Sequence, residues 1–457
     1  MSVAVDVRAG RLARDARWLA LPLTLLAAAL GAAAVVSPLA ALVAAAALLY
    51  IALAFHDLAA GVALFATVTF LEALPGVAAT ELGAIKAAGL VLVLSALRRS
   101  GTPVLLKERP ALAFGAMFLA AWALSSSLWA RDPDTATGSG VRLLLDVALL
   151  FIVFAAVRSA RDARWLVWGY IGGAAASAVV GFFSATYAAD TGRLAGGLGD
   201  PNFLAAMLVP ALVLSVFALS WTKQAALRWL LAGCILLFAV ALFLTQSRGG
   251  LVALSVALLA ALVYGGSARR HFAVLATLVA TVGIAYYAAF ASSTELERLL
   301  HPGGGTGRSD LWSVAARVIG DHPVVGVGAG NFPLVAPEYA AETINLPAVH
   351  LLVDRPQVVH NTYLGVFADL GVVGLITFVL VVGTVLALAR RSARLFARMH
   401  DTDLELVSRA VFVSLVGMLA AFVFLSGELE KQLWLLLGLA VALDGLAHRR
   451  ARAAAGG

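Results

Sequence analysis

Charged residues are scarce in this chain, and their scarcity excludes most soluble folds. Asp, Glu, Lys and Arg make up 13% of the 457 residues, whereas a soluble domain typically has about 25%. Hydrophobic residues make up 62%, and the mean hydropathy is +0.94. Lipid rather than water is therefore expected to be the main solvent of this protein.

Two further absences narrow the fold. Cys234 is the only cysteine, which excludes an intrachain disulfide, and a thiol inside an apolar run is expected to pack rather than react. The apolar runs show no alternation with period two, which excludes a transmembrane barrel. Only helices and closed barrels satisfy their backbone groups in lipid. The sequence therefore predicts an all-α polytopic membrane protein.

Apolar runs of 16 to 20 residues recur along almost the whole chain, and each is long enough to cross a hydrocarbon core of about 30 Å. They predict about 14 transmembrane helices (12–14). The run near 82–97 is the weakest, because it is short and contains Lys86. The first run follows Arg8, Arg11, Arg14 and Arg17 like a signal peptide, but we expect it to remain as a span. The predicted spans lie near 18–36, 39–55, 59–75, 82–97, 110–129, 141–157, 165–186, 202–220, 228–245, 250–266, 272–290, 361–388, 408–426 and 432–447.

The distribution of basic residues predicts the orientation, because cytoplasmic loops collect Lys and Arg. With both termini inside, 23 of the 33 basic residues fall on the cytoplasmic side and nine on the outer side. The formal net charge of +7 arises from these short clusters, as expected for loops that face anionic lipid. We therefore expect the lipid bilayer, and no nucleic acid, as a partner.

One connection is much longer than the others: residues 291–360 form an outer loop, and long structured loops are usually functional. Ser309 and Asp310 can cap a short helix, Leu311–Ile319, inside it. We expect three parts of the chain: N-terminal transmembrane helices over 1–190, a core over 191–390 that includes this partly helical loop, and C-terminal helices with a basic tail over 391–457.

Polar residues gather where three predicted spans begin on the outer side. Free N–H groups and the positive end of the helix dipole point there and favour anions. Arginine binds phosphate through two parallel hydrogen bonds, so a diphosphate suits this arrangement. For each single arginine, an anchor to lipid phosphate is the alternative. The three starts carry Arg193 with Asp200-Pro201-Asn202, Gln246-Ser247-Arg248-Gly249-Gly250, and Val359-His360-Asn361-Thr362.

Three other patterns in the sequence resemble ligand-binding motifs. Gly307-Arg308-Ser309-Asp310 places another cation before the loop helix, either as a ligand group or as a solvated cap. Gly326-Val327-Gly328-Ala329-Gly330 has dinucleotide-like spacing, but no strand precedes it, so we expect a turn. Asp132-Pro133-Asp134 lies in a short loop, and we expect no metal there or elsewhere.

These motifs, taken in order over roughly residues 190–385, resemble the O-antigen ligase and O-antigen polymerase superfamily of bacterial envelope glycosyltransferases. The resemblance also rests on Leu311-Trp312, His322-Pro323 and Gly326-Val327-Gly328. Further along, Tyr363, Leu370-Gly371 and Gly374-Leu375 extend it.

The resemblance implies a metal-independent enzyme without a cofactor in the bacterial inner membrane, with its active site facing the periplasm. It would move a glycan from undecaprenyl diphosphate to an acceptor hydroxyl on a glycolipid, the lipid A core for a ligase, or on another lipid-linked glycan for a polymerase. Carried over by motif, His360 is the catalytic base, and Arg193, Arg248 and, with a less defined role, Arg308 bind the diphosphate. Asp200, Asn202, Ser247, Gly249 and Asn361 support them.

Several alternatives stay open. Ligase and polymerase are hard to separate by sequence, and transfer to protein hydroxyls is a third possibility. A transporter or flippase would also have many spans, but is expected to carry more ionisable residues inside them. Only Lys86 and Asp146 stand out in this respect. A channel or a structural scaffold does not require a cluster of polar residues at the helix starts on the outer side.

Overall fold

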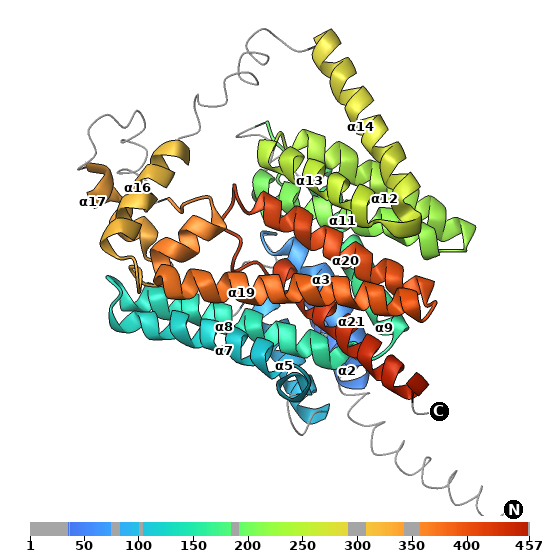
Figure 1. Ribbon diagram of the computed structural model, residues 1–457, viewed down its shortest axis with the longest axis horizontal. Coiled ribbons are helices and arrows are strands. Elements are labelled where there is room, and N and C mark those ends of the chain that lie inside the picture. The colour runs from blue at the N-terminus through green and yellow to red at the C-terminus, as the bar shows by residue number, and fades with distance from the viewer. Residues whose placement is uncertain are drawn as a thin grey trace, which may run out of the picture.

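The structure, a computed structural model, describes residues 35, 37–74, 83–99, 104–183, 192–290, 308–341 and 357–455. Every regular element within these ranges is helical, which confirms the all-α fold. Long helices run side by side, and the short helices α16 and α17 lie together at one end (Figure 1). The α-helices are α2 (Pro38–His56), α3 (Leu58–Val68), α5 (Ala84–Arg99), α6 (Val104–Glu108), α7 (Pro110–Ser125), α8 (Pro133–Ala156), α9 (Ala160–Phe183), α11 (Pro201–Trp221), α12 (Ala225–Leu244), α13 (Arg248–Tyr264), α14 (Arg269–Phe290), α16 (Arg308–Asp321), α17 (Phe332–Ala341), α19 (Thr362–Arg398), α20 (Thr402–Ala421) and α21 (Lys431–Ala455).

Fewer candidate membrane spans lie in the described ranges than the sequence predicts for the whole chain. Within the described ranges, seven helices are long and apolar enough to cross a bilayer. An eighth is added if α13 and the helix after it count as one broken span, although they are bent by 117°. The protein is polytopic, and the part of the chain that the structure describes does not clearly show the predicted 12–14 spans.

Helix length explains most of the difference. The predicted spans 39–55 and 59–75 correspond to apolar helices of shorter extent, Ala41–His56 and Leu58–Leu71. The predicted span 82–97 is α5, which has 16 residues. The predicted spans 250–266 and 272–290 form the bent pair. The predicted first span, except for residue 35, lies outside the described residues.

The core is built around α11 and α20, the two candidate spans with the largest buried shares, 83% and 78%. Glycine allows this close packing: a Cβ on Gly417 of α20 would lie 2.9 Å from Cβ of Ala257 in α13 and 3.0 Å from Cγ1 of Val209 in α11. Small residues let helices approach closely in lipid, where apolar burial gives little preference for one neighbour. Helices α11 and α13 are thereby both held against α20.

The helical geometry of α19 is interrupted at its tenth residue, Gly371. Gly371 has φ 67° and ψ −172°, outside the helical region. A Cβ there would lie 2.0 Å from the carbonyl oxygen of Val324, so only glycine fits. The backbone N–H of Val372 donates to the carbonyl oxygen of Pro323 at 2.9 Å. The turn that follows α16 therefore packs into the break in α19.

The outer loop forms a small unit with its own apolar cluster. The predicted loop helix is confirmed as α16, which starts at Arg308 and ends at Asp321, and α17 packs against it. The 326–330 segment is a turn, as expected: N–H groups of Val327 and Gly328 donate to the carbonyl oxygens of Ala368 and Asp369. The cluster contains Leu311, Val314, Ala315, Val318, Val327, Phe332, Val335, Ala336, Ala340, Val359 and Ala368.

Two side chains fasten this unit to the transmembrane helices. Asp369 accepts hydrogen bonds from the backbone N–H of Gly330 at 2.8 Å and of Phe332 at 2.9 Å. The Oδ1 atom of Asn331 accepts from the N–H of Asp132 at 2.8 Å, next to the start of α8. Asn331 is fully buried, and satisfied buried polar groups of this kind fix a unique arrangement. The outer unit is thus docked on α8 and α19.

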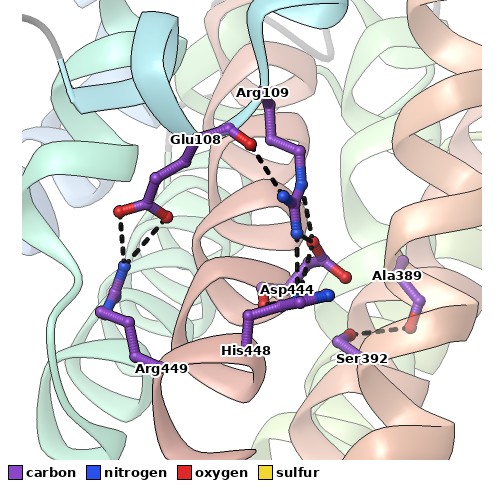
Figure 2. Close-up of polar contacts among 7 residues, drawn as sticks. All are labelled: Glu108, Arg109, Ala389, Ser392, Asp444, His448 and Arg449. Carbon is purple, nitrogen blue, oxygen red and sulfur yellow. Dashed lines mark hydrogen bonds and ion pairs between the residues drawn. The ribbon is translucent and has the colours of Figure 1, made fainter. Parts of the chain in front are cut away.

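At the opposite end of α8 and α21 lies a polar network that the sequence analysis overlooked. Asp444 lies inside the predicted span 432–447, is fully buried, and accepts a hydrogen bond from Nε of Arg109 at 3.0 Å. Nη1 of Arg449 lies 3.3 Å from both carboxylate oxygens of Glu108. Figure 2 shows both pairs, which connect the α6–α7 junction to α21. Ionisable residues within spans are therefore not limited to Lys86 and Asp146.

Candidate active site

The three helix starts predicted to hold an anion are capped as their sequences suggest. Asp200 accepts from the N–H groups of Asn202 and Phe203 at the start of α11, at 2.7 and 2.9 Å. Ser247 accepts from Gly250 at the start of α13, at 3.2 Å. Asn361 accepts from Tyr363 and Leu364 at the start of α19, at 3.0 and 3.1 Å. These caps satisfy some of the free helix-start donors themselves, which leaves the neighbouring cations as the principal groups for an anion.

Arg193 is held in place by two hydrogen bonds. Its Nε donates to the carbonyl oxygen of Thr245 at 2.8 Å, and its Nη2 donates to Oδ1 of Asn202 at 2.8 Å. The N–H of Leu194 also donates to the carbonyl oxygen of Leu244 at 3.0 Å. The segment before α11 therefore lies against the α12–α13 turn, and Arg193 is brought next to the helix start that carries Arg248.

The two glycines after Arg248 serve close packing. A Cβ on Gly249 would lie 3.1 Å from Cβ of Phe424, and one on Gly250 would lie 2.7 Å from Cβ of Ala205 in α11. The neighbours of these glycines are thus protein side chains. Arg248 itself is exposed, and it forms no ion pair with a carboxylate among the described residues. Its fork is available to an outside anion.

Arg308 joins this group from the outer loop. Partial burial is the main reason that the pKa of Arg308 lies below its ordinary value, and the like charges of Arg193 and Arg248 lower it further. The carboxylate of Asp200 acts in the opposite direction. Charges influence each other in this way only at short range, since salt screens longer separations. Three arginines from three separate segments therefore lie near one another, together with the carboxylate of Asp200.

His360 lies in the same region. It is half-buried and precedes the cap residue of α19, with φ 52°. Burial is the main cause that lowers the pKa of His360, the charge of Arg308 lowers it further, and Asp200 raises it. A lowered pKa keeps the imidazole neutral near pH 7, the form that can accept a proton. Non-glycine residues with this backbone conformation are uncommon and often occur at functional sites.

A turn between α20 and α21 holds the start of α19, two residues after His360. The hydroxyl of Thr362 donates to the carbonyl oxygen of Leu425 at 2.7 Å and accepts from the N–H of Gly427 at 2.8 Å. The N–H of Thr362 donates to the carbonyl oxygen of Phe422 at 2.9 Å. Thr362 is fully buried. The start of α19 is therefore fixed by residues about sixty positions later, and no local pattern predicts such a contact.

Two aromatic rings connect α16 to the α20–α21 turn next to Gly249. Trp312 and Phe424 are stacked with ring centroids 6.5 Å apart, and Phe424 also contacts the Gly249 position. Trp312 belongs to one of the sequence motifs but has no predicted role, and no sequence motif includes Phe424. Their pairing could be recognised only once α16 and the α20–α21 turn were placed together.

No metal-binding cluster is found among the described residues. Within the described ranges, no three or more His, Cys, Asp and Glu side chains gather in a way that could hold a metal ion. Asp132 is occupied as the cap of α8, because it accepts from Thr135 Oγ1 at 2.6 Å and from the N–H of Asp134 at 3.3 Å. The Asp132-Pro133-Asp134 sequence is thus explained by helix capping.

Comparison with protein families adds a direct match to this geometry. Residues 232–379 match the family described as O-antigen ligase. This part of the chain is therefore similar to the O-antigen ligase family. No curated protein matches the chain. The matched segment includes Arg248, Arg308 and His360, whereas Arg193 and Asp200 precede it and reach the same region through the fold.

Proposed function

We propose that this protein is a membrane glycosyltransferase that moves a glycan from undecaprenyl diphosphate to an acceptor hydroxyl on the periplasmic side, as an O-antigen ligase with a lipid A core acceptor. The coarser assignment, a membrane protein with an O-antigen ligase domain, follows from the family match. The donor, acceptor and orientation belong to the proposal.

One observation carries it: the charges of Arg193 and Arg248 act on Arg308, and those of Arg308 and Asp200 act on His360. A glycan transfer from a lipid diphosphate needs cations at the leaving group and a base at the nucleophile. Both kinds of group are present here, on segments that are far apart in the sequence. A diphosphate would neutralise the cluster of like charges, which favours its binding.

In the proposed reaction, neutral His360 takes the proton of the acceptor hydroxyl as its oxygen attacks the anomeric carbon. The bond from that carbon to the diphosphate oxygen breaks, and the diphosphate leaves with the electron pair. The guanidinium groups stabilise the charge that develops on the diphosphate, and preorganised donors of this kind are usually the largest catalytic contribution. The donor is already activated, so the proposal includes no metal and no cofactor.

A polymerase that joins lipid-linked repeat units uses the same chemistry and is the second candidate. A transporter is disfavoured, because the ionisable network around Asp444 is closed by Arg109 rather than left to line a path. The experiment is a transfer assay with purified protein, a glycan on undecaprenyl diphosphate, and either a lipid A core or a second lipid-linked unit as acceptor. Transfer to the core supports the ligase, and chain growth on the carrier supports the polymerase. Movement of the glycolipid across liposomes without any product would replace both with transport.

A further inference from the structure

Two cavities at the end of α8 remote from His360 share part of their walls. The first has a volume of about 310 Å³ and an almost wholly apolar lining, which includes Leu97 of α5, Leu105 of α6 and Phe151 of α8. The second has a volume of about 380 Å³ and is lined by Arg99, Arg158 and Arg161 among other residues. Ala96 and Ala155 belong to both linings. An apolar groove and a cationic pocket therefore lie next to each other.

The carboxylates of the polar pocket are already engaged. Asp162 accepts from the backbone N–H of Arg158 at 3.0 Å and of Ser159 at 2.9 Å. Asp57 accepts from the N–H groups at the start of α3 and pairs with Arg161 at 3.2 Å. Three arginines thus face two carboxylates that are committed to helix starts. The pocket has an excess of positive charge.

Donors remain for a ligand. Arg158 uses its Nε to bond the carbonyl oxygen of Ala155 at 2.8 Å, and within the described ranges no hydrogen bond occupies its two Nη atoms. Arg99 donates from Nη2 to the carbonyl oxygen of Phe55 at 2.9 Å. Its other terminal nitrogen makes no hydrogen bond to the part of the chain that the structure describes. Paired guanidinium donors of this kind suit a phosphate.

Helix α6 forms one wall of the apolar groove. Leu105 belongs to α6, and α6 ends at Glu108, which pairs with Arg449 of α21 (Figure 2). The charges of Glu108 and Arg449 also act on Arg158. The apolar wall and the cationic pocket are therefore parts of one connected structure.

The place of these cavities fixes the leaflet relative to the active site. Asp132, which precedes α8, bonds to Asn331 of the outer unit, whereas Arg158 follows the end of α8. The 24 residues of α8 span about 36 Å at 1.5 Å per residue, roughly the thickness of a bilayer core. The pocket thus lies at the leaflet opposite to His360.

We propose that this groove and pocket bind one anionic phospholipid of the leaflet opposite the active site. Its phosphate group would lie between Arg99 and Arg158, and one acyl chain would lie along Leu97, Leu105 and Phe151. A soluble phosphate would use only the cationic part, whereas a phospholipid uses both. An apolar chain next to a phosphate is the ligand chemistry that matches the two linings together.

The test uses purified full-length protein and native mass spectrometry with phosphatidylglycerol or phosphatidylcholine. Wild-type protein should retain phosphatidylglycerol at least about tenfold better than phosphatidylcholine. Arg158→Gln removes the phosphate contact, and Ala148→Phe fills the groove, which Ala148 lines; each should abolish this preference. The matched control is Arg269→Gln, since Arg269 is an exposed arginine outside both cavities whose side chain, among the described residues, bonds the carbonyl oxygen of Val263.

Folding is monitored separately by the thermal unfolding midpoint in neutral detergent without phospholipid. Phosphatidylglycerol should raise the midpoint of wild-type and Arg269→Gln protein and leave those of the two site variants unchanged. Equal retention of the two lipids would mean ordinary annular lipid and overturn the proposal. Displacement of phosphatidylglycerol by millimolar inorganic phosphate would also overturn it, in favour of a free phosphate site.

Discussion

Nη2 of Arg193 donates a 2.8 Å hydrogen bond to Oδ1 of Asn202, which lies in the first turn of α11. Asn202 therefore acts as a positioning residue for a cation of the proposed diphosphate site. A hydrogen bond of this kind contributes about 0.5–1.5 kcal/mol, and more when one partner is charged. The neighbouring Asp200 caps the same helix, so the helix start itself does not depend on Asn202.

Asn202→Ala should therefore weaken donor binding by about three- to tenfold, with a smaller effect on the maximal rate. Titration of purified protein with undecaprenyl diphosphate glycan checks this. Gln224→Ala is the control, because Gln224 is an exposed amide at another helix start and makes no side-chain capping bond. An unchanged dissociation constant for Asn202→Ala would show that Arg193 does not contact the donor.

Arg248→Lys should lose most transfer activity while the protein still inserts and accumulates. Lysine keeps the charge but lacks the planar pair of donors, and Arg248 is exposed at the start of α13. Initial rates of product formation at saturating acceptor measure the effect. Arg269→Lys, an exchange at an exposed arginine elsewhere, should retain wild-type rates. Near-normal turnover by Arg248→Lys would reduce Arg248 to a lipid anchor.

His360→Gln should fold, bind the donor and transfer about 10² to 10⁴ times more slowly, the contribution typical of a positioned base. Glutamine retains a polar side chain but cannot take up the proton. Separate measurements of donor binding and single-turnover rate distinguish the two steps. Wild-type rates in this variant would exclude a catalytic role, and a loss of binding together with the rate would assign His360 to the donor site.

Arg308→Gln should move the acidic limb of the pH–rate profile to higher pH. The charge of Arg308 lowers the pKa of His360, so its removal raises that pKa. The imidazole is then protonated, and inactive as a base, at pH values where the wild-type imidazole is still neutral. Rates between pH 5 and 8 test this sign. A limb displaced to lower pH would contradict the placement of Arg308 beside His360.

Gly371→Ala and Gly383→Ala should change stability in opposite directions, although both lie in α19. At Gly371 a Cβ would clash with the backbone of Val324 at a φ of 67°, so the change should lower stability by at least about 1–3 kcal/mol. At Gly383 a Cβ meets no atom within 4 Å, and alanine should add up to about 1 kcal/mol. Thermal unfolding of the two purified variants measures both effects.

The orientation is tested by cysteine labelling in a Cys234→Ala background. Ala316 in α16 and Thr402 at the start of α20 are both exposed. A membrane-impermeant maleimide added from outside should label Ala316→Cys and spare Thr402→Cys, because the basic residues place α16 outside. Labelling only after membrane disruption should reveal the second site. The reverse pattern would place the active site in the cytoplasm.

Local signals predicted the caps well. Asp200, Ser247 and Asn361 cap α11, α13 and α19 because their short side chains reach N–H groups two or three residues later. Such contacts depend only on neighbouring residues. The loop helix α16 was predicted for the same reason, since its apolar stripe and its ends lie within one short segment.

Features that depend on distant partners could not be predicted. The apolar sequence around Gly371 reads as uninterrupted helix, and only the turn after α16 explains its break. Trp312 and Phe424 meet across more than a hundred positions. The described residues contain fewer candidate spans than the sequence predicts, because hydropathy does not report whether an apolar run such as α5 forms a helix long enough to cross the membrane.

The bonds of Thr362 to Leu425 and Gly427 tie the assembly of the proposed site to the order of synthesis. Ribosomes make a chain from its N-terminus, so Arg193, Arg248 and Arg308 are made before the turn that fixes the start of α19. The start of α19 can therefore reach this arrangement only after the α20–α21 turn has been made.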